Sequence, residues 1–259
     1  VLGPHRTVDD CTGELTEALR VSFVQTADVP LHACSRRAAL RPAATYGVYA
    51  VAVTPRARKV SLQVRLLAEV EALAGCTAAA RTRLRYALRH VPPSLDPELT
   101  WRRTLLFVHG FNICVADAAG QFAQLLSLGE FAPALTPVVF GWPCSKGASY
   151  FNGKRAIYDT DDAVGRLVEF VAELRSAGCE ELHVMAHSLG AALFCRAAAV
   201  PEFGRDLHVR TVTLLHPDVP LKDFVGRWAH VVRACCPVVV VLADRRDGAL
   251  VYSEVFNRA

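Results

Sequence analysis

AHSLG, residues 186–190, stands between an apolar run, Leu182 to Ala186, and a second apolar stretch, Ala191 to Val200. The first run predicts a strand and the second a helix, so the pentapeptide predicts the sharp turn that joins them. The small residues at positions 186 and 190 suit this turn, because larger side chains would collide in its cramped backbone. Ser188 is therefore a candidate nucleophile, displayed on a strand–turn–helix elbow.

Strand and helix signals alternate along the chain on both sides of this elbow from residue 104 onward. The expected strands are Leu105–Val108, Val138–Phe140, Leu182–Met185, Val209–Leu215 and Pro237–Ala243, and the expected helices are Ala116–Leu128, Thr160–Ala177, Ala191–Val200 and Leu221–Val232. Strands that alternate with helices pair in parallel, and right-handed crossovers then cover both faces of the sheet. The sequence predicts an α/β fold with a mostly parallel sheet.

The N-terminal part carries different signals. Val21–Thr26 and Tyr46–Val53 are rich in β-favouring residues and predict two early strands. Residues 60–90 are expected to be helical, because apolar side chains recur at helical spacing from Val60 to Leu73 and again within Thr77 to His90.

Composition and charge set the outer limits of the prediction. The chain has 259 residues, 52% of them hydrophobic, which suffices for one large core, so a single domain over 1–259 is expected. No apolar run approaches the ~18 residues of a membrane-spanning helix. Residues 1–103 hold 15 basic and 9 acidic side chains, whereas residues 104–259 hold 14 and 16. The basic N-terminal part is a candidate docking face for a protein partner, and nucleic-acid binding is not expected because no recognisable module accompanies it.

The cysteines indicate a reducing compartment. The sequence has nine, an odd number that are scattered and never form a C-x-x-C pair, which argues against a disulfide framework and a zinc site. The arginine-rich composition and the missing initial methionine leave two compartments open, the cytoplasm and the mitochondrial matrix. No nucleotide cofactor or metal is expected, since G-x-G-x-x-G, P-loop and H-E-x-x-H motifs do not occur.

Five short motifs occur in order along the chain. They are FVHGFN at 107–112, GWP at 141–143, YD at 158–159 with DA at 162–163, MAHSLG at 185–190 and PDV at 217–219. Together they resemble an alpha/beta-hydrolase family known as a domain of unknown function. The resemblance extends from about Tyr46 to Leu250. It implies an esterase- or lipase-like fold and says little about the substrate, a small acyl ester if the protein is active.

The chemistry of such a serine requires an oxyanion hole and an orienting acid. The backbone N–H of Leu189 and an N–H from the loop after Leu105–Val108, which we assign to Phe111, are the expected oxyanion donors. Asp247 follows the last predicted strand and is the preferred acid. Asp218 is the alternative, although an aspartate ahead of Pro220 and a helix is also a common N-cap.

The general base is the weak point of this prediction. Nine histidines occur, and none follows Asp247, whereas the order serine, acid, histidine is typical of this fold. His216 is the nearest substitute by topology. The sequence therefore predicts a hydrolase-like protein that is inactive as given and lacks the last strand of the fold. Two hypotheses stay open: a serine acyl hydrolase whose histidine lies beyond Ala259, or a non-catalytic accessory subunit of a larger, possibly mitochondrial, assembly.

Overall fold

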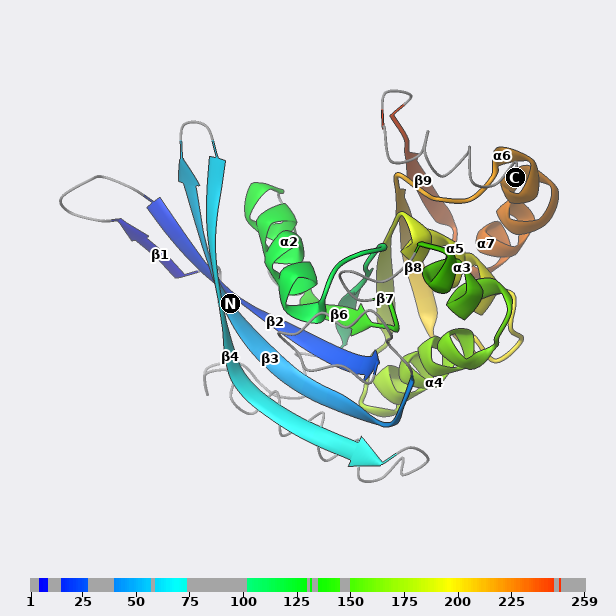
Figure 1. Ribbon diagram of the computed structural model, residues 1–259, viewed down its shortest axis with the longest axis horizontal. Helices are drawn as coiled ribbons and strands as arrows, with labels where there is room; N and C mark the ends of the chain where they lie inside the picture. Colours follow the sequence, from blue (N-terminus) through cyan, green and yellow to red (C-terminus); the bar gives the residue numbers. More distant parts are fainter. Residues whose placement is uncertain are drawn as a thin grey trace.

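The computed structural model describes residues 5–8, 15–27, 40–56, 59–73, 102–129, 131, 135–144, 150–244 and 247. Its strands form one mixed sheet in the order β4-β3-β2-β6-β5-β7-β8-β9, and β1 pairs with β2 (Figure 1). The strands are β1 His5–Val8, β2 Leu15–Ala27, β3 Leu40–Arg56, β4 Lys59–Leu73, β5 Arg103–Val108, β6 Thr136–Gly141, β7 Glu181–His187, β8 His208–Leu215 and β9 Val238–Leu242.

The sheet changes direction along its width. Strands β1 to β4 pair antiparallel with one another, and β2 then pairs in parallel with β6. From β6 to β9 every neighbouring pair is parallel. The predicted α/β architecture with a mostly parallel sheet is confirmed. The predicted absence of a last strand concerns residues past β9, which, apart from positions 243, 244 and 247, lie outside the described residues.

Helices lie on both faces of the sheet. They are α2 Val115–Leu128, α3 Tyr150–Tyr158, α4 Asp162–Ser176, α5 Leu189–Ala198, α6 Leu221–Asp223, the π-helical turn η1 Phe224–Trp228 and α7 Ala229–Cys235. Helix α2 packs on the same hydrophobic cluster as β2, β3 and β5, whereas α4, α5 and α7 share a second cluster on the opposite face (Figure 1). None of the described helices is both long and apolar enough to cross a bilayer.

Strand β5 shows why the sheet is covered on both faces. Leu105 and Phe107 belong to the cluster under α2, whereas Leu106 and Val108 belong to the cluster under α4 and α5. Side chains of a strand point alternately to opposite faces, so a continuous apolar run satisfies both clusters at once. Predicted strands and helices from residue 104 onward match the structure to within a few residues, and α3 is an additional helix that the sequence analysis did not predict.

The predicted helix at residues 60–90 is wrong over the residues that the structure describes. Lys59–Leu73 is the long strand β4, which pairs antiparallel with β3 along its length. Its apolar residues also alternate with period two, as at Val60, Leu62 and Val64, and pairing with β3 selects this period over the helical one. The second predicted stretch, Thr77 to His90, lies outside the described residues.

Candidate active site

Ser188 lies on the turn between β7 and α5, with a backbone conformation that few side chains adopt. Its φ is +52° and its ψ is −123°, and the residue is half-buried. A Cβ added to Gly190 would come within 2.4 Å of the carbonyl oxygens of Val108 and His109, so the helix that begins here packs directly on the end of β5. Only glycine fits at position 190, because any side chain would collide with these carbonyl oxygens. The turn places Ser188 at the carboxyl edge of the parallel strands.

Strained backbone gathers at this edge. Among the described residues, the non-glycine positions with positive φ are Asn112, Ser188, Asp206 and His216. Three of them directly follow or closely follow the carboxyl ends of β5, β7 and β8. Such conformations cost of order 1–3 kcal/mol each and are concentrated in proteins at functional sites. The backbone thus marks the same edge that the sequence motif predicts.

The loop after β5 is fixed by contacts between its own buried histidine, His109, and Trp142. The Trp142 indole N–H donates to the His109 carbonyl oxygen at 2.9 Å, and the two rings stack with centroids 5.8 Å apart. The His109 Nδ1 lies 2.9 Å from the Gly110 carbonyl oxygen, to which it donates in the neutral tautomer. Burial lowers the pKa of His109 to about 4, so the ring is uncharged at neutral pH. His109 therefore shapes the loop.

Gly110 allows this loop to lie against the elbow. An added Cβ at Gly110 would come within 2.9 Å of both the Ser188 Cβ and the His187 Nδ1. Phe111, the next residue, is therefore carried on a loop in direct contact with the serine. Phe111 and Leu189, the two expected oxyanion donors, also share a neighbour, because a Cβ at Gly153 of α3 would touch the side chains of both. The structure thus brings Phe111 and Leu189, the residues predicted to supply the donors, close to Ser188.

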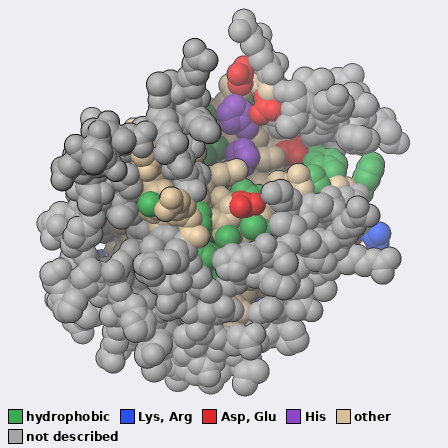
Figure 2. Space-filling view, turned by 60° about the vertical axis from the view of Figure 1, so that its left-hand side comes forward, with side chains coloured by type: hydrophobic (Ala, Val, Ile, Leu, Met, Phe, Trp, Pro, Cys, Tyr) green, Lys and Arg blue, Asp and Glu red, His purple; other side chains and the backbone are tan. Residues whose placement is uncertain are grey.

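His216 and Asp247 lie against each other at the ends of β8 and β9. The His216 Nδ1 is 3.0 Å from the Asp247 Oδ2, which is within ion-pair distance, although the angles of this contact do not meet those of a hydrogen bond. The His216 backbone N–H donates to the Leu242 carbonyl oxygen at 2.7 Å, which ties the two strand ends together. Figure 2 shows histidine and acidic side chains gathered on this face of the molecule.

His216 is also next to the nucleophile along the sheet. The Ser188 backbone N–H donates to the Leu215 carbonyl oxygen at 2.9 Å, and the Asp218 N–H donates to the Ser188 carbonyl oxygen at 3.1 Å. Residues on both sides of His216 in the chain therefore bond to Ser188. The nearby His187 has a lowered pKa, chiefly because it is buried and also because His216 lies close to it.

Asp218, the alternative acid, faces a different neighbour. It is only 5% exposed, and its Oδ2 accepts a hydrogen bond of 2.6 Å from the Tyr150 hydroxyl of α3. The short helix α6 takes Pro220 as its N-cap, so Asp218 does not occupy the cap position that the sequence analysis considered. Sequence reasoning missed Tyr150, since a tyrosine outside any predicted element gave no signal.

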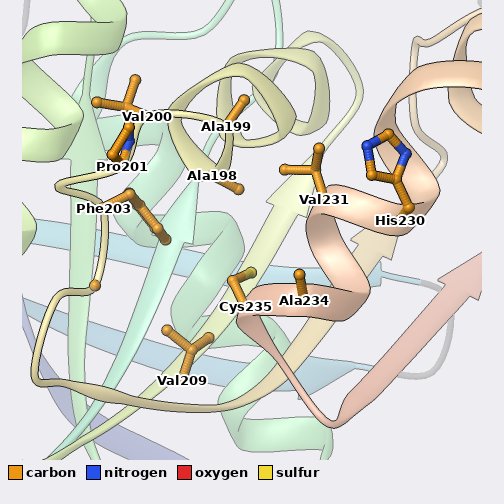
Figure 3. A pocket seen from close by; sticks show the side chains of 11 residues that line it. Ala198, Ala199, Val200, Pro201, Phe203, Val209, His230, Val231, Ala234 and Cys235 are labelled. Atoms are coloured by element: carbon orange, nitrogen blue, oxygen red, sulfur yellow. The ribbon is translucent and has the colours of Figure 1, made fainter.

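A separate pocket lies at the other end of α5. It has a volume of about 480 Å³ and is lined by the end of α5, the turn that follows it, α7 and the start of β8, including Ala198, Phe203, Val209, His230 and Cys235 (Figure 3). Helix α5 begins next to Ser188 and runs from Leu189 to Ala198, about 15 Å at 1.5 Å per residue. The pocket is therefore remote from the elbow. No group of three or more metal-binding side chains gathers within the described part of the chain.

Comparison with known proteins agrees with this geometry. No curated protein and no solved structure matches the chain. A family model described as "alpha/beta hydrolase of unknown function" (DUF900) matches residues 97–259. This match covers β5 to β9, the elbow at Ser188, and both His216 and Asp247. The chain therefore belongs to this alpha/beta-hydrolase family.

Proposed function

We propose that the protein is a serine ester hydrolase in which Ser188 is the nucleophile, His216 the general base and Asp247 the acid that orients it. The observation that carries the proposal is the 3.0 Å approach of the His216 Nδ1 to the Asp247 Oδ2 at the strand end beside Ser188. The order of the triad along the chain would be serine, histidine, acid. The predicted inactivity rests on the order serine, acid, histidine, and triads are defined by geometry and roles, not by order.

Each step of an acyl transfer can be assigned to one of these residues. With its Nδ1–H directed at Asp247, His216 would accept the Ser188 proton on Nε2 as Oγ attacks the ester carbonyl carbon. The carbonyl π-bond electrons move to its oxygen, and the resulting oxyanion receives the N–H groups of Leu189 and Phe111. Collapse expels the alcohol with the proton from His216, leaving an acyl-serine. Water, deprotonated by His216, then releases the acid and restores Ser188.

The other histidines near the elbow are poorer bases. His109 is 2% exposed and its Nδ1 contacts the Gly110 carbonyl oxygen beneath the loop. The His187 Nδ1 lies 2.9 Å from where a Cβ of Gly110 would be, and the residue immediately precedes the nucleophile in the chain. A positioned base contributes typically 10²–10⁴-fold to the rate. His216 is thus the described histidine whose contacts best support this role.

Phosphonylation by a fluorophosphonate probe, in which the serine oxygen displaces fluoride from phosphorus, tests the proposal. Wild-type protein is expected to be labelled, Ser188→Ala not at all, and His216→Gln at least ~10²-fold more slowly. His208→Gln is the matched control, because His208 is exposed at the opposite end of the same strand. If folded wild-type protein is not labelled, the enzyme proposal fails. The non-catalytic accessory subunit, docking through the basic residues 1–103, then becomes the better explanation.

A further inference from the structure

Helix α3 contacts both sides of the candidate oxyanion hole. Gly153, in the middle of the helix, is buried so closely that an added Cβ would lie 3.2 Å from the Phe111 Cδ2 and 3.3 Å from the Leu189 Cδ1. The Tyr150 ring meets the Phe111 ring edge to face, with centroids 5.5 Å apart. The side chains of the two residues whose backbone N–H groups would bind the oxyanion therefore share one packing partner, the first half of α3.

The same helix is fastened to the elbow on the β8 side. The Tyr150 hydroxyl donates to the Asp218 Oδ2 at 2.6 Å, and the Asp218 backbone N–H donates to the Ser188 carbonyl oxygen. A continuous series of contacts thus runs from Phe111 through Tyr150 and Asp218 to Ser188. A hydrogen bond that accepts at a carboxylate is roughly twice as strong as a neutral one. The bond between Tyr150 and Asp218 therefore holds the first turn of α3 against the segment that follows β8.

We infer that Tyr150 and Asp218 are positioning residues that hold the oxyanion donors in register with Ser188. The inference rests on the proposed serine hydrolase and deepens it. Neither side chain needs to touch the substrate, because the hydroxyl–carboxylate bond acts through α3 on Phe111 and Leu189. Displacements near 1 Å can cost on the order of 10²-fold in rate when they misalign reacting groups. Loss of the bond should therefore appear in the chemical step more than in substrate binding.

Tyr150→Phe tests this role, since it removes the hydroxyl and keeps the ring that packs on Phe111. We expect kcat for an aryl ester to fall roughly 10- to 100-fold while KM changes less than about twofold, because an interaction important only in the transition state lowers kcat. Asp218→Ala should match Tyr150→Phe, whereas Asp218→Asn retains an acceptor oxygen and should recover most of the activity. Asn152→Ala, at an exposed position of the same helix, is the matched control and should behave as wild type.

Hydrogen–deuterium exchange provides a readout that does not depend on activity. In Tyr150→Phe, amides of α3 and of the loop after β5 should exchange faster together, while α4 stays as in wild type. If Tyr150→Phe retains wild-type kcat and wild-type exchange, the positioning role is wrong. If wild-type protein has no esterase activity, the proposed function fails. The exchange data still decide the connection, because unchanged exchange in both segments overturns it and coupled acceleration supports it.

Discussion

The antiparallel and parallel regions of the sheet differ in strand length and in where residues with strained backbone occur. Strands β3 and β4 extend over 17 and 15 residues in a single antiparallel ladder. The parallel strands β5 to β9 are 5 to 8 residues long, and all four described non-glycine residues with positive φ lie in that region. The antiparallel strands extend the sheet, and the parallel strands end in strained turns. The candidate chemistry lies where the strain is.

The contrast between the two regions of the sheet fails if the strained edge of the parallel strands is not catalytic. Substitution of the two candidate acids, Asp247 and Asp218, tests this most directly. Asp247→Asn is expected to slow acylation of Ser188 by roughly 10²–10⁴-fold, because an amide facing His216 favours the wrong ring tautomer. Asp218→Asn should change the rate only slightly, since it preserves an acceptor for Tyr150. Rates of fluorophosphonate labelling at equal protein stability measure both. The reverse order of effects would make Asp218 the acid.

Close packing at the same edge predicts the largest stability effect. Gly190→Ala is expected to lower the free energy of unfolding by about 3 kcal/mol, because the new Cβ would overlap carbonyl oxygens of β5 that belong to backbone and cannot move aside. Gly165→Ala in α4 is the control, where an added Cβ meets nothing within 4 Å. It should stabilise the protein by about 0.5–1 kcal/mol. Urea unfolding of the two variants checks the contrast, and equal stabilities would refute the packing argument.

A pH dependence follows from the buried histidine beneath the loop. The pKa of His109 falls from 6.5 to about 4 on folding, so between these values the unfolded chain binds the proton and the folded protein does not. The contribution of His109 to the free energy of unfolding is therefore fully present above pH ~7 and is lost progressively as the pH falls toward 4. The loss due to His109 should reach about 2 kcal/mol at pH 5.

Urea unfolding at pH 7.5 and pH 5.0 measures this loss. His109→Gln should remove most of the difference between the two pH values, although its stability at pH 7.5 will also be lower because the stacking on Trp142 is lost. His208→Gln, at an exposed site, should leave the difference as in wild type. If His109→Gln and wild type show the same pH dependence of stability, another titrating group is responsible for it and not His109.

The smallest effect concerns the contact between the two regions. Tyr46 on β3 donates from its hydroxyl to a carboxylate oxygen of Glu173 on α4, and burial raises the pKa of both groups. Tyr46→Phe should cost about 1–2 kcal/mol in the free energy of unfolding, because the partly buried carboxyl group loses a donor. Calorimetry of this variant beside Tyr158→Phe checks the value. A neutral Tyr46→Phe would mean that apolar packing alone joins the regions.

The sequence predicts the parallel region well and the antiparallel region poorly, for a physical reason. In β5 to β9 the apolar runs are short, and helices separate them, so length and alternation identify them. In β4 the residues at even positions from 60 to 72 are apolar or alanine, but Leu67 adds an apolar residue out of phase. The pairing with β3 shifts register at this point, with Val48 opposite Ala68 and Tyr49 opposite Leu66. This bulge let a helical period compete with the strand period.

The candidate site was predictable in its parts and less so in its pairing. The elbow, the loop after β5 and Asp218 follow from short motifs, and Asp247 follows from its place after the last predicted strand. The contact of His216 with Asp247 depends on β8 and β9 being neighbours, so that their carboxyl ends meet, and no motif in the sequence specifies this pairing. Helix α3 gave little signal, because Gly153 has a low helix propensity and only positions 153 and 157 are buried.

The tryptophan beneath the loop after β5 gives the molecule a built-in optical sensor. The Trp142 indole both stacks on His109 and holds its carbonyl oxygen, so any motion of the loop that carries Phe111 changes the surroundings of a fluorophore. A protonated imidazole quenches indole emission more strongly than a neutral one. The sequence has two other tryptophans, Trp101 and Trp228. With both replaced by phenylalanine, emission from Trp142 should report loop displacement and His109 ionisation in real time, without any added label or substrate.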